Sequence, residues 1–266
     1  MEQANKIIQR ELKVSNKIFD TRSLEKDYPT VIPILTKGIR VLDVGCGTGA
    51  ISKGIANRVG SNGHVIGIDN TEKFIISGNE SYGQTANLKL IHSDLFSFNS
   101  AEKFDVIVSA RTLQWLNNPQ EAIVKMKSLL KPGGQLSILD YNHEQLEWDP
   151  LPPQSMQLYY QSFLNWRSKA GMNNHISEDL VDYFREAGFT SIATFDSDET
   201  YKREDTNFVE KIGIWSKVAT LNQVIEEGYI SGELRNKAIE EYDQWINTSA
   251  QRMTMKLKEV RGTNND

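Results

Sequence analysis

A glycine-rich turn directly after a short apolar run restricts the possible folds of this chain more than any other feature. The run Val41-Leu42-Asp43-Val44 leads into Gly45-Cys46-Gly47-Thr48-Gly49, and a helical pattern begins at about residue 49. Glycines accept positive φ angles and let a ligand approach the backbone closely, while a helix N-terminus offers free N–H groups. The segment therefore predicts a buried strand, a ligand-binding turn and a helix in an α/β protein.

Strand and helix patterns continue to alternate after this turn. Strands are expected at residues 40–44, 64–68, 88–92, 104–109, 135–140 and 191–195. Helical patterns lie near residues 49–58, 71–81, 119–130 and 177–187. This order is typical of βαβ units, so we expect a Rossmann-like, doubly wound, mostly parallel sheet of about seven strands.

The remaining segments suggest additions to that sheet. Residues 1–38 are expected to be a helical lead-in that packs on the main domain, residues 39–200. Within this domain residues 141–175 are rich in Trp, Tyr and Pro, and we interpret them as an aromatic insertion or lid after the fifth strand. Residues 201–266 are expected to form a helical C-terminal extension with a frayed end, which could add to the lid or form a homodimer face.

Composition and charge argue against several classes of protein. No apolar run approaches the roughly 20 residues of a membrane span and the start of the chain has no signal-peptide core, so a cytoplasmic location is expected. The single cysteine and 4 scattered histidines offer no metal-ligand spacing. A net charge of −5, from 30 Lys+Arg against 35 Asp+Glu, argues against a nucleic-acid partner and favours a small-molecule substrate.

Acidic residues follow the second and third expected strands. Asp69 comes directly after strand 64–68, where doubly wound folds place an acid that accepts hydrogen bonds from both ribose hydroxyls. Asp94 and Leu95 follow strand 88–92 and could bind an adenine amine and its ring. Because the loop reads G-x-G-x-G and lacks the G-x-G-x-x-G spacing, a dinucleotide pyrophosphate site is disfavoured.

Five segments in this order resemble the class I S-adenosylmethionine-dependent methyltransferases, near the small-molecule branch that contains ubiquinone- and menaquinone-biosynthesis enzymes. They are VLDVGCGTG, GID, SDLF, FDVIVS and LKPGG, and the resemblance covers residues 39–195. It implies S-adenosylmethionine as the cofactor and S-adenosylhomocysteine as its product.

The same resemblance implies a set of cofactor-binding residues. The methionine part would lie along Gly45, Cys46 and Gly47, with Asp43 orienting the loop or reaching the amino group. Asp69 would hold the ribose, and Asn70, Asp94 and Leu95 would surround the adenine. The segment passing under the sulfonium would be Ser109, Ala110 and Arg111. The structural alternative is that Asp43 only binds loop amides and that Asp69 and Asp94 are helix N-caps.

His143 is the candidate general base on the acceptor side. It follows the fifth expected strand, at the edge where the cofactor turn lies, and a histidine can take a proton from an oxygen or carbon acceptor near neutral pH. The alternative is a histidine bonded to the backbone. The aromatic residues of the insertion likewise have two interpretations, an acceptor pocket or the apolar stripe of a packed helix.

The leading hypothesis is methyl transfer from S-adenosylmethionine to a small molecule. Methylation of RNA or protein is disfavoured by the acidic balance, and Ser109-Ala110-Arg111-Thr112 stands where many amino-group methylases of those substrates carry Asn/Asp-Pro-Pro-aromatic. The further alternatives are a non-catalytic S-adenosylmethionine-binding protein and, weakest, an NAD-dependent oxidoreductase.

Overall fold

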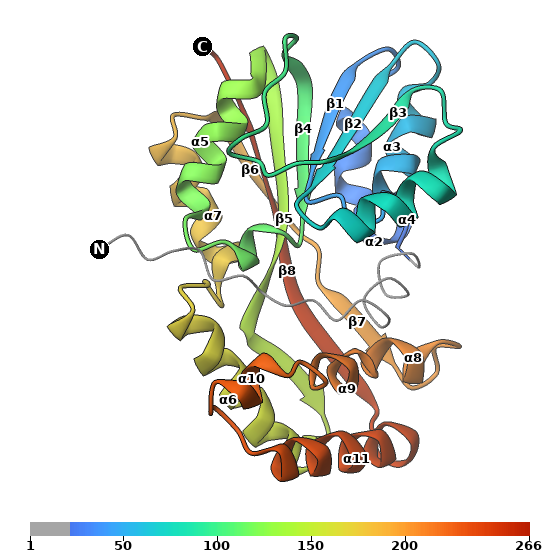
Figure 1. Ribbon diagram of the computed structural model, residues 1–266, viewed down its shortest axis with the longest axis vertical. Helices are drawn as coiled ribbons and strands as arrows, with labels where there is room; N and C mark the ends of the chain where they lie inside the picture. The colour runs from blue at the N-terminus through green and yellow to red at the C-terminus, as the bar shows by residue number, and fades with distance from the viewer. Residues whose placement is uncertain (1–21) are drawn as a thin grey trace. The chain divides into compact units, whose positions relative to one another are not determined.

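The computed structural model describes residues 22–266, which form two compact units (Figure 1). The sheet unit contains residues 22–140, 176–197 and 258–266, and the helical unit contains residues 141–175 and 198–257. The predicted insertion and C-terminal extension thus belong mostly to one unit, and the chain returns to the sheet unit twice. The sequence suggested two separate additions because it does not show which distant segments pack together.

The sheet unit carries the predicted doubly wound sheet, with strand order β3-β2-β1-β4-β5-β8-β6. Its strands are β1 (Arg40–Val44), β2 (His64–Asp69), β3 (Leu88–His92), β4 (Phe104–Ala110), β5 (Leu130–Asp149), β6 (Thr190–Asp196) and β8 (Arg252–Thr263). The pairs β1–β2, β2–β3, β1–β4 and β4–β5 are parallel, whereas β6 and β8 are antiparallel. The order reverses between β1 and β4, and ligands bind at such a switch point in open α/β sheets.

Helices complete the sheet unit. They are α2 (Leu24–Asp27), η1 (Pro29–Ile34), α3 (Ala50–Val59), α4 (Glu72–Tyr82), η2 (Leu113–Trp115), α5 (Pro119–Leu129) and α7 (Ile176–Glu186). Figure 1 shows α3 and α4 beside β2 and β3, and α7 beside β6. The main core lies between the sheet and α5 and α7, where Leu42, Ile107 and Leu136 pack with Met126 and Phe184. The lead-in expected at residues 1–38 is described only from residue 22.

The end of the chain differs from the prediction of a helical extension. Residues 252–263 form strand β8, and the terminus is not frayed, because the Asn264 N–H donates to the Gly134 carbonyl at 2.8 Å. Glu259 and Arg261 of β8 place charges in the strand pattern. Glu259 is buried, and its Oε1 accepts hydrogen bonds from Arg261 Nη2 at 2.6 Å and from Ser137 Oγ at 2.5 Å.

Strand β5 is also longer than predicted. It begins at Leu130 instead of Gln135, runs through Pro132-Gly133-Gly134, and ends at Asp149 instead of Asp140. Polar residues after Asp140 gave no apolar strand signal, since many of them are exposed in the structure.

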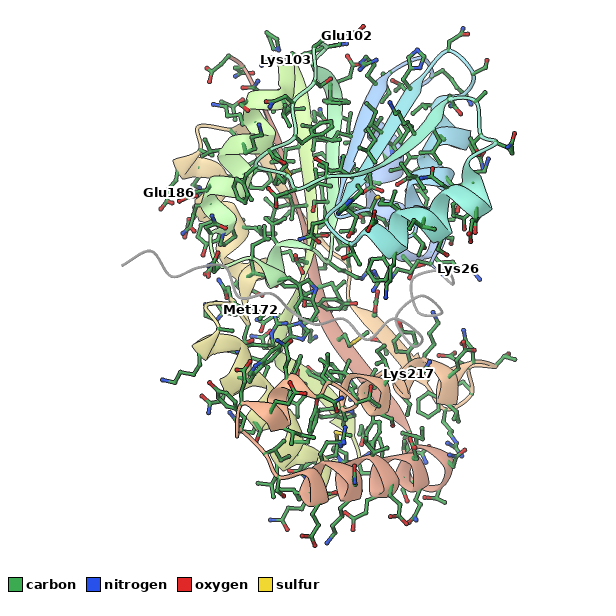
Figure 2. All side chains as sticks on the ribbon, viewed as in Figure 1. Lys26, Glu102, Lys103, Met172, Glu186 and Lys217 are labelled. Atoms are coloured by element: carbon green, nitrogen blue, oxygen red, sulfur yellow. The ribbon has the colours of Figure 1, made fainter. Side chains whose placement is uncertain are left out.

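The helical unit contains α6 (Gln154–Lys169), β7 (Glu199–Lys202), α8 (Phe208–Ile212), α9 (Ile214–Val218), α10 (Gln223–Glu226) and α11 (Gly232–Thr248). Strand β7 pairs antiparallel with residues 252–255 of β8. Tyr159, Phe163 and Trp166 of α6 are buried, as expected for the stripe of a packed helix, and α6 packs on α11. Side chains fill the interior of each unit (Figure 2). Between residues 22 and 266, no helix combines the length and the apolar character needed to cross a membrane.

Candidate functional site

The glycine loop between β1 and α3 folds over the end of β2. The N–H groups of Gly45 and Cys46 both donate to the carbonyl of Ile68, at 2.8 and 3.0 Å. Gly45 has a φ of 73°, and a Cβ atom there would lie 2.2 Å from Thr112 Oγ1. Only glycine fits this position, because a side chain would be strained and would also collide with Thr112.

Asp69 lies at the end of β2 and is 5% exposed. Its Oδ2 accepts a hydrogen bond from the Gly47 N–H at 2.9 Å, and its Oδ1 accepts one from the Thr71 N–H at 2.8 Å. Asp69 therefore braces the glycine loop and the start of α4. A carboxylate has about four lone-pair sites, so these two bonds leave acceptor capacity for ribose hydroxyls.

Asp43 lies beneath the same loop and is 3% exposed. Its Oδ2 accepts a hydrogen bond from the Ser52 hydroxyl of α3 at 2.6 Å. Burial raises the pKa of Asp43 from 3.8 to about 6; the Ser52 hydrogen bond opposes this rise, and the neighbouring charge of Asp69 adds to it. Burial disfavours the charged form of this carboxylate, and a cationic partner would stabilise that form.

The raised pKa of Asp43 predicts a pH-dependent loss of stability in the ligand-free protein. The folded state holds the proton more tightly than the unfolded chain, so stability is lost as pH rises from the ordinary pKa of 3.8 through about 6. Since one pKa unit corresponds to about 1.4 kcal/mol, the cost above pH 6 is on the order of 3 kcal/mol.

Chemical denaturation of Asp43→Asn and wild type at several pH values measures this cost. The variant is expected to be the more stable protein at pH 7.5, and its advantage should shrink as the pH falls toward 4. An advantage that does not change with pH would show that Asp43 is not the group responsible.

Cys46 has the environment of a structural residue. Burial raises the pKa of its thiol well above the ordinary value, and the charges of Asp43 and Asp69 raise it further. A thiol held neutral in this way is a poor nucleophile. The environment of the thiol disfavours covalent catalysis, and a backbone role for Cys46 stays a prediction.

The residues expected around the adenine differ in their surroundings. Asn70 and Asp94 are exposed, beyond the ends of β2 and β3. Asp94 Oδ1 accepts a hydrogen bond from the Phe96 N–H at 2.8 Å, which stabilises the turn after β3. Leu95 packs in the main core, and this packing explains its burial without a ligand.

The segment Ser109-Ala110-Arg111 lies at the end of β4, next to the glycine loop. Ser109 is fully buried, and its hydroxyl donates to the Val44 carbonyl at 3.0 Å, which ties β4 to β1. Arg111 is left-handed with a φ of 59° and is 5% exposed. The predicted cofactor residues of β1, β2 and β4 are thus brought together at the carboxyl edge of the sheet unit.

His143 belongs to the helical unit, and the premise that it follows the end of the fifth strand is wrong, because β5 continues to Asp149. It is 8% exposed among aromatic rings, with centroid distances of 5.2 Å to Tyr141 and 6.1 Å to Trp215. Burial lowers the pKa of His143 well below 6.5, and the charge of Arg167 lowers it further. The imidazole is therefore neutral at neutral pH, the form that can accept a proton; its catalytic role stays a prediction.

Three supporting contacts were not predicted from the sequence. Ser52 binds Asp43, Thr112 covers Gly45, and Asp140 Oδ2 accepts a hydrogen bond from the Gln114 N–H at 3.1 Å. Thr112 and Asp140 make their contacts across elements that are distant in sequence, whereas Ser52 follows Asp43 by 9 residues in a segment whose spacing gave no separate signal. In the described part of the chain, no group of three or more His, Cys, Asp or Glu residues could hold a metal ion.

The sequence of the chain matches a known protein family. A family model described as a methyltransferase domain matches residues 35–210, more than half of the chain. The chain belongs to this methyltransferase family. The matched residues include every predicted cofactor residue of the methyltransferase and also His143. The resemblance to class I S-adenosylmethionine-dependent methyltransferases is confirmed.

Individual relatives agree with this assignment. The methyltransferase is 29% identical to demethylmenaquinone methyltransferase from Staphylococcus aureus over 171 residues, which are 59% of this chain and 70% of the relative. An S-adenosylmethionine-dependent methyltransferase structure from Aquifex aeolicus has a TM-score of 0.54 at 18% identity, covering 94% of this chain and 97% of that one.

A second structure is phosphoethanolamine N-methyltransferase 2 from Haemonchus contortus, solved with phosphomonomethylethanolamine and S-adenosylhomocysteine. Its TM-score is 0.55 at 16% identity, and the match covers 90% of this chain but only 53% of that one. These structures confirm the doubly wound methyltransferase fold.

Proposed function

We propose that this methyltransferase transfers a methyl group from S-adenosylmethionine to a small-molecule acceptor, and that the glycine loop and the acids of β1 and β2 hold the donor. The observation that carries the proposal is the pair Asp43 and Asp69, two buried carboxylates directly beside the loop. The G-x-G-x-G spacing of the loop disfavours the pyrophosphate of a dinucleotide, and the buried negative charge attracts a ligand with cationic groups. S-adenosylmethionine carries two, an ammonium and a sulfonium, and supplies the methyl group from the latter.

The residues of the loop fit such a donor. A ligand can lie against the backbone at Gly47, which has a positive φ angle and no side chain, whereas Thr112 fills the side-chain space of Gly45 and fixes the start of the loop. Asp43 would neutralise the ammonium, and Asp69 would accept hydrogen bonds from the ribose while it braces Gly47. The exposed Asn70 and Asp94 would lie near the adenine at the open edge of the site.

The acceptor is proposed only as a class, a small organic molecule. The Staphylococcus aureus relative is named for demethylmenaquinone and the Haemonchus contortus structure for a phosphoethanolamine, so relatives of this fold include enzymes named for quite different small acceptors. His143 would accept the proton if the acceptor is a hydroxyl or a carbon acid. A cytoplasmic location and a homodimer through the C-terminal helices stay predictions, and light scattering of the purified protein tests the second.

The proposed activity is tested by forming the product. Purified protein is incubated with labelled S-adenosylmethionine and a panel of quinols, phenols and amines, and S-adenosylhomocysteine is measured by mass spectrometry. Acceptor-dependent formation of S-adenosylhomocysteine is expected. Formation only with RNA or protein substrates would contradict the small-molecule proposal.

Two matched variants separate the proposed roles of the acids. Asp69→Asn should weaken binding of both S-adenosylhomocysteine and 5′-methylthioadenosine by about tenfold or more, because both ligands contain the ribose. Asp43→Asn should weaken only S-adenosylhomocysteine, because methylthioadenosine has no ammonium. Calorimetry with each ligand measures the four affinities. If Asp69→Asn leaves both affinities unchanged, Asp69 only supports the loop.

A further inference from the structure

Arg111 has an unusual backbone conformation for a residue with a large side chain. Its φ of 59° is left-handed, and among the described residues only Ser191 shares a positive φ without being glycine. Such conformations persist where the surrounding structure holds them, and they cluster at functional sites. Arg111 directly follows β4, at the carboxyl edge where the proposed donor site lies.

Strand β5 and helix η2 hold this conformation in place. The Arg111 N–H donates to the Leu139 carbonyl at 2.7 Å, and its carbonyl accepts a hydrogen bond from Gln114 Nε2 at 3.2 Å. The Gln114 N–H in turn donates to Asp140 Oδ2. The turn is thus fixed at both ends by β5.

The left-handed turn determines where the next residue lies. Thr112 packs over Gly45 so closely that its Oγ1, Cγ2 and Cβ atoms occupy the space of a Gly45 side chain. Its Oγ1 also donates to the Ala110 carbonyl at 3.2 Å. The conformation of Arg111 therefore positions the side chain that covers the first glycine of the loop.

The guanidinium of Arg111 makes a second connection, to α2. Its Nη2 donates to the carbonyl of Asp27, the last residue of α2, at 3.0 Å. The label of Lys26 shows the position of α2 in Figure 2. With four residues, α2 is too short to be stable by itself. After α2, the Tyr28 hydroxyl and Ser137 Oγ form a hydrogen bond at 2.7 Å, and Arg261 Nη2 donates to the Thr30 carbonyl at 2.7 Å. The Arg111 guanidinium links this segment to the end of β4.

We propose that Arg111 is a positioning residue with two separable roles: its left-handed backbone seats Thr112 against the glycine loop, and its guanidinium holds α2 at the end of β4. The inference rests on the proposed function, because it treats the glycine loop as the donor site. It predicts that changes in backbone preference at residue 111 alter donor affinity, whereas loss of the guanidinium alters the order of α2.

Arg111→Gly and Arg111→Ala distinguish the two roles. Glycine accepts the left-handed conformation and alanine resists it, but both lack the guanidinium. Because both variants lack the guanidinium, they differ in backbone preference, and the alanine variant should bind S-adenosylhomocysteine about fivefold or more weakly than the glycine variant. In both variants, amide hydrogen exchange of residues 22–28 should become about tenfold faster.

Controls separate these effects from a general loss of structure. Ser191→Gly and Ser191→Ala make the same backbone change in β6 and should leave donor affinity unchanged. Arg111→Asn, which also tolerates a positive φ, replaces Arg111→Gly if that variant does not fold, and Arg111→Lys should slow the exchange of residues 22–28 relative to Arg111→Gly.

Equal donor affinities of the glycine and alanine variants would overturn the backbone role. Unchanged exchange of residues 22–28 would overturn the role of the guanidinium. A wild-type protein that does not bind S-adenosylhomocysteine would instead refute the proposed function, so the two failures are distinguishable.

Discussion

The Gly45→Ala variant is expected to bind S-adenosylhomocysteine about 100-fold more weakly than the wild-type protein, a loss of about 2.7 kcal/mol. The φ of 73° is strained for alanine, and its Cβ would lie 2.2 Å from Thr112 Oγ1. Either the loop or Thr112 must move, and both belong to the proposed donor site. Isothermal titration calorimetry measures the loss, and circular dichroism verifies that the variant is folded.

Gly38→Ala is the matched control for this variant. Gly38 has a φ of 84°, but a Cβ atom there would meet nothing within 4 Å. Its substitution should cost some stability and leave donor affinity unchanged. Adding Thr112→Gly to Gly45→Ala removes the colliding atoms and should restore part of the affinity. A folded Gly45→Ala protein with wild-type affinity would mean that the donor does not lie against the loop.

The His143→Phe variant is expected to lose about 10²–10⁴-fold in turnover if the acceptor must be deprotonated, while donor affinity stays the same. Phenylalanine preserves an aromatic ring among Tyr141, Phe163 and Trp215 but cannot accept a proton. Turnover is measured as S-adenosylhomocysteine formed with the best acceptor from the panel. Because burial lowers the pKa of His143, wild-type turnover should fall only below pH 6.5.

Comparison with His143→Ala distinguishes catalysis from packing. If His143 only fills the aromatic cluster, the alanine variant loses thermal stability and the phenylalanine variant keeps its turnover per folded molecule. Retained turnover in His143→Phe would remove His143 from the mechanism and leave an acceptor that is already nucleophilic or that another group deprotonates.

The first half of the sheet was predictable because its strands are short apolar runs, of which β1, β2 and β4 are mostly buried. β1 and β3 begin and end at the predicted residues, and β2 and β4 are each one residue longer. β8 was missed because Glu259 and Arg261 form an ion pair inside the protein, so the strand has charged residues where a strand pattern requires apolar ones. Such a pair becomes predictable only when Ser137, more than a hundred residues away, is known to contact it.

The site was predictable to a similar extent. Glycine spacing indicated the loop, the strand-end position indicated Asp69, and the family resemblance implied Asp43; all three depend on local sequence. The left-handed turn at Arg111 and the cover of Gly45 by Thr112 were not predictable, since they arise where β1, β4 and β5 meet. His143 was expected after the end of the fifth strand but lies within β5, because the polar residues after Asp140 hide the second half of this strand.

Calorimetric titration of the wild-type protein with S-adenosylhomocysteine and, separately, with NAD tests the central claim most directly. The G-x-G-x-G spacing of the loop, with Asp43 and Asp69 beside it, predicts one binding site for S-adenosylhomocysteine in the micromolar range and no comparable heat with NAD. Tighter binding of NAD than of S-adenosylhomocysteine would contradict the account.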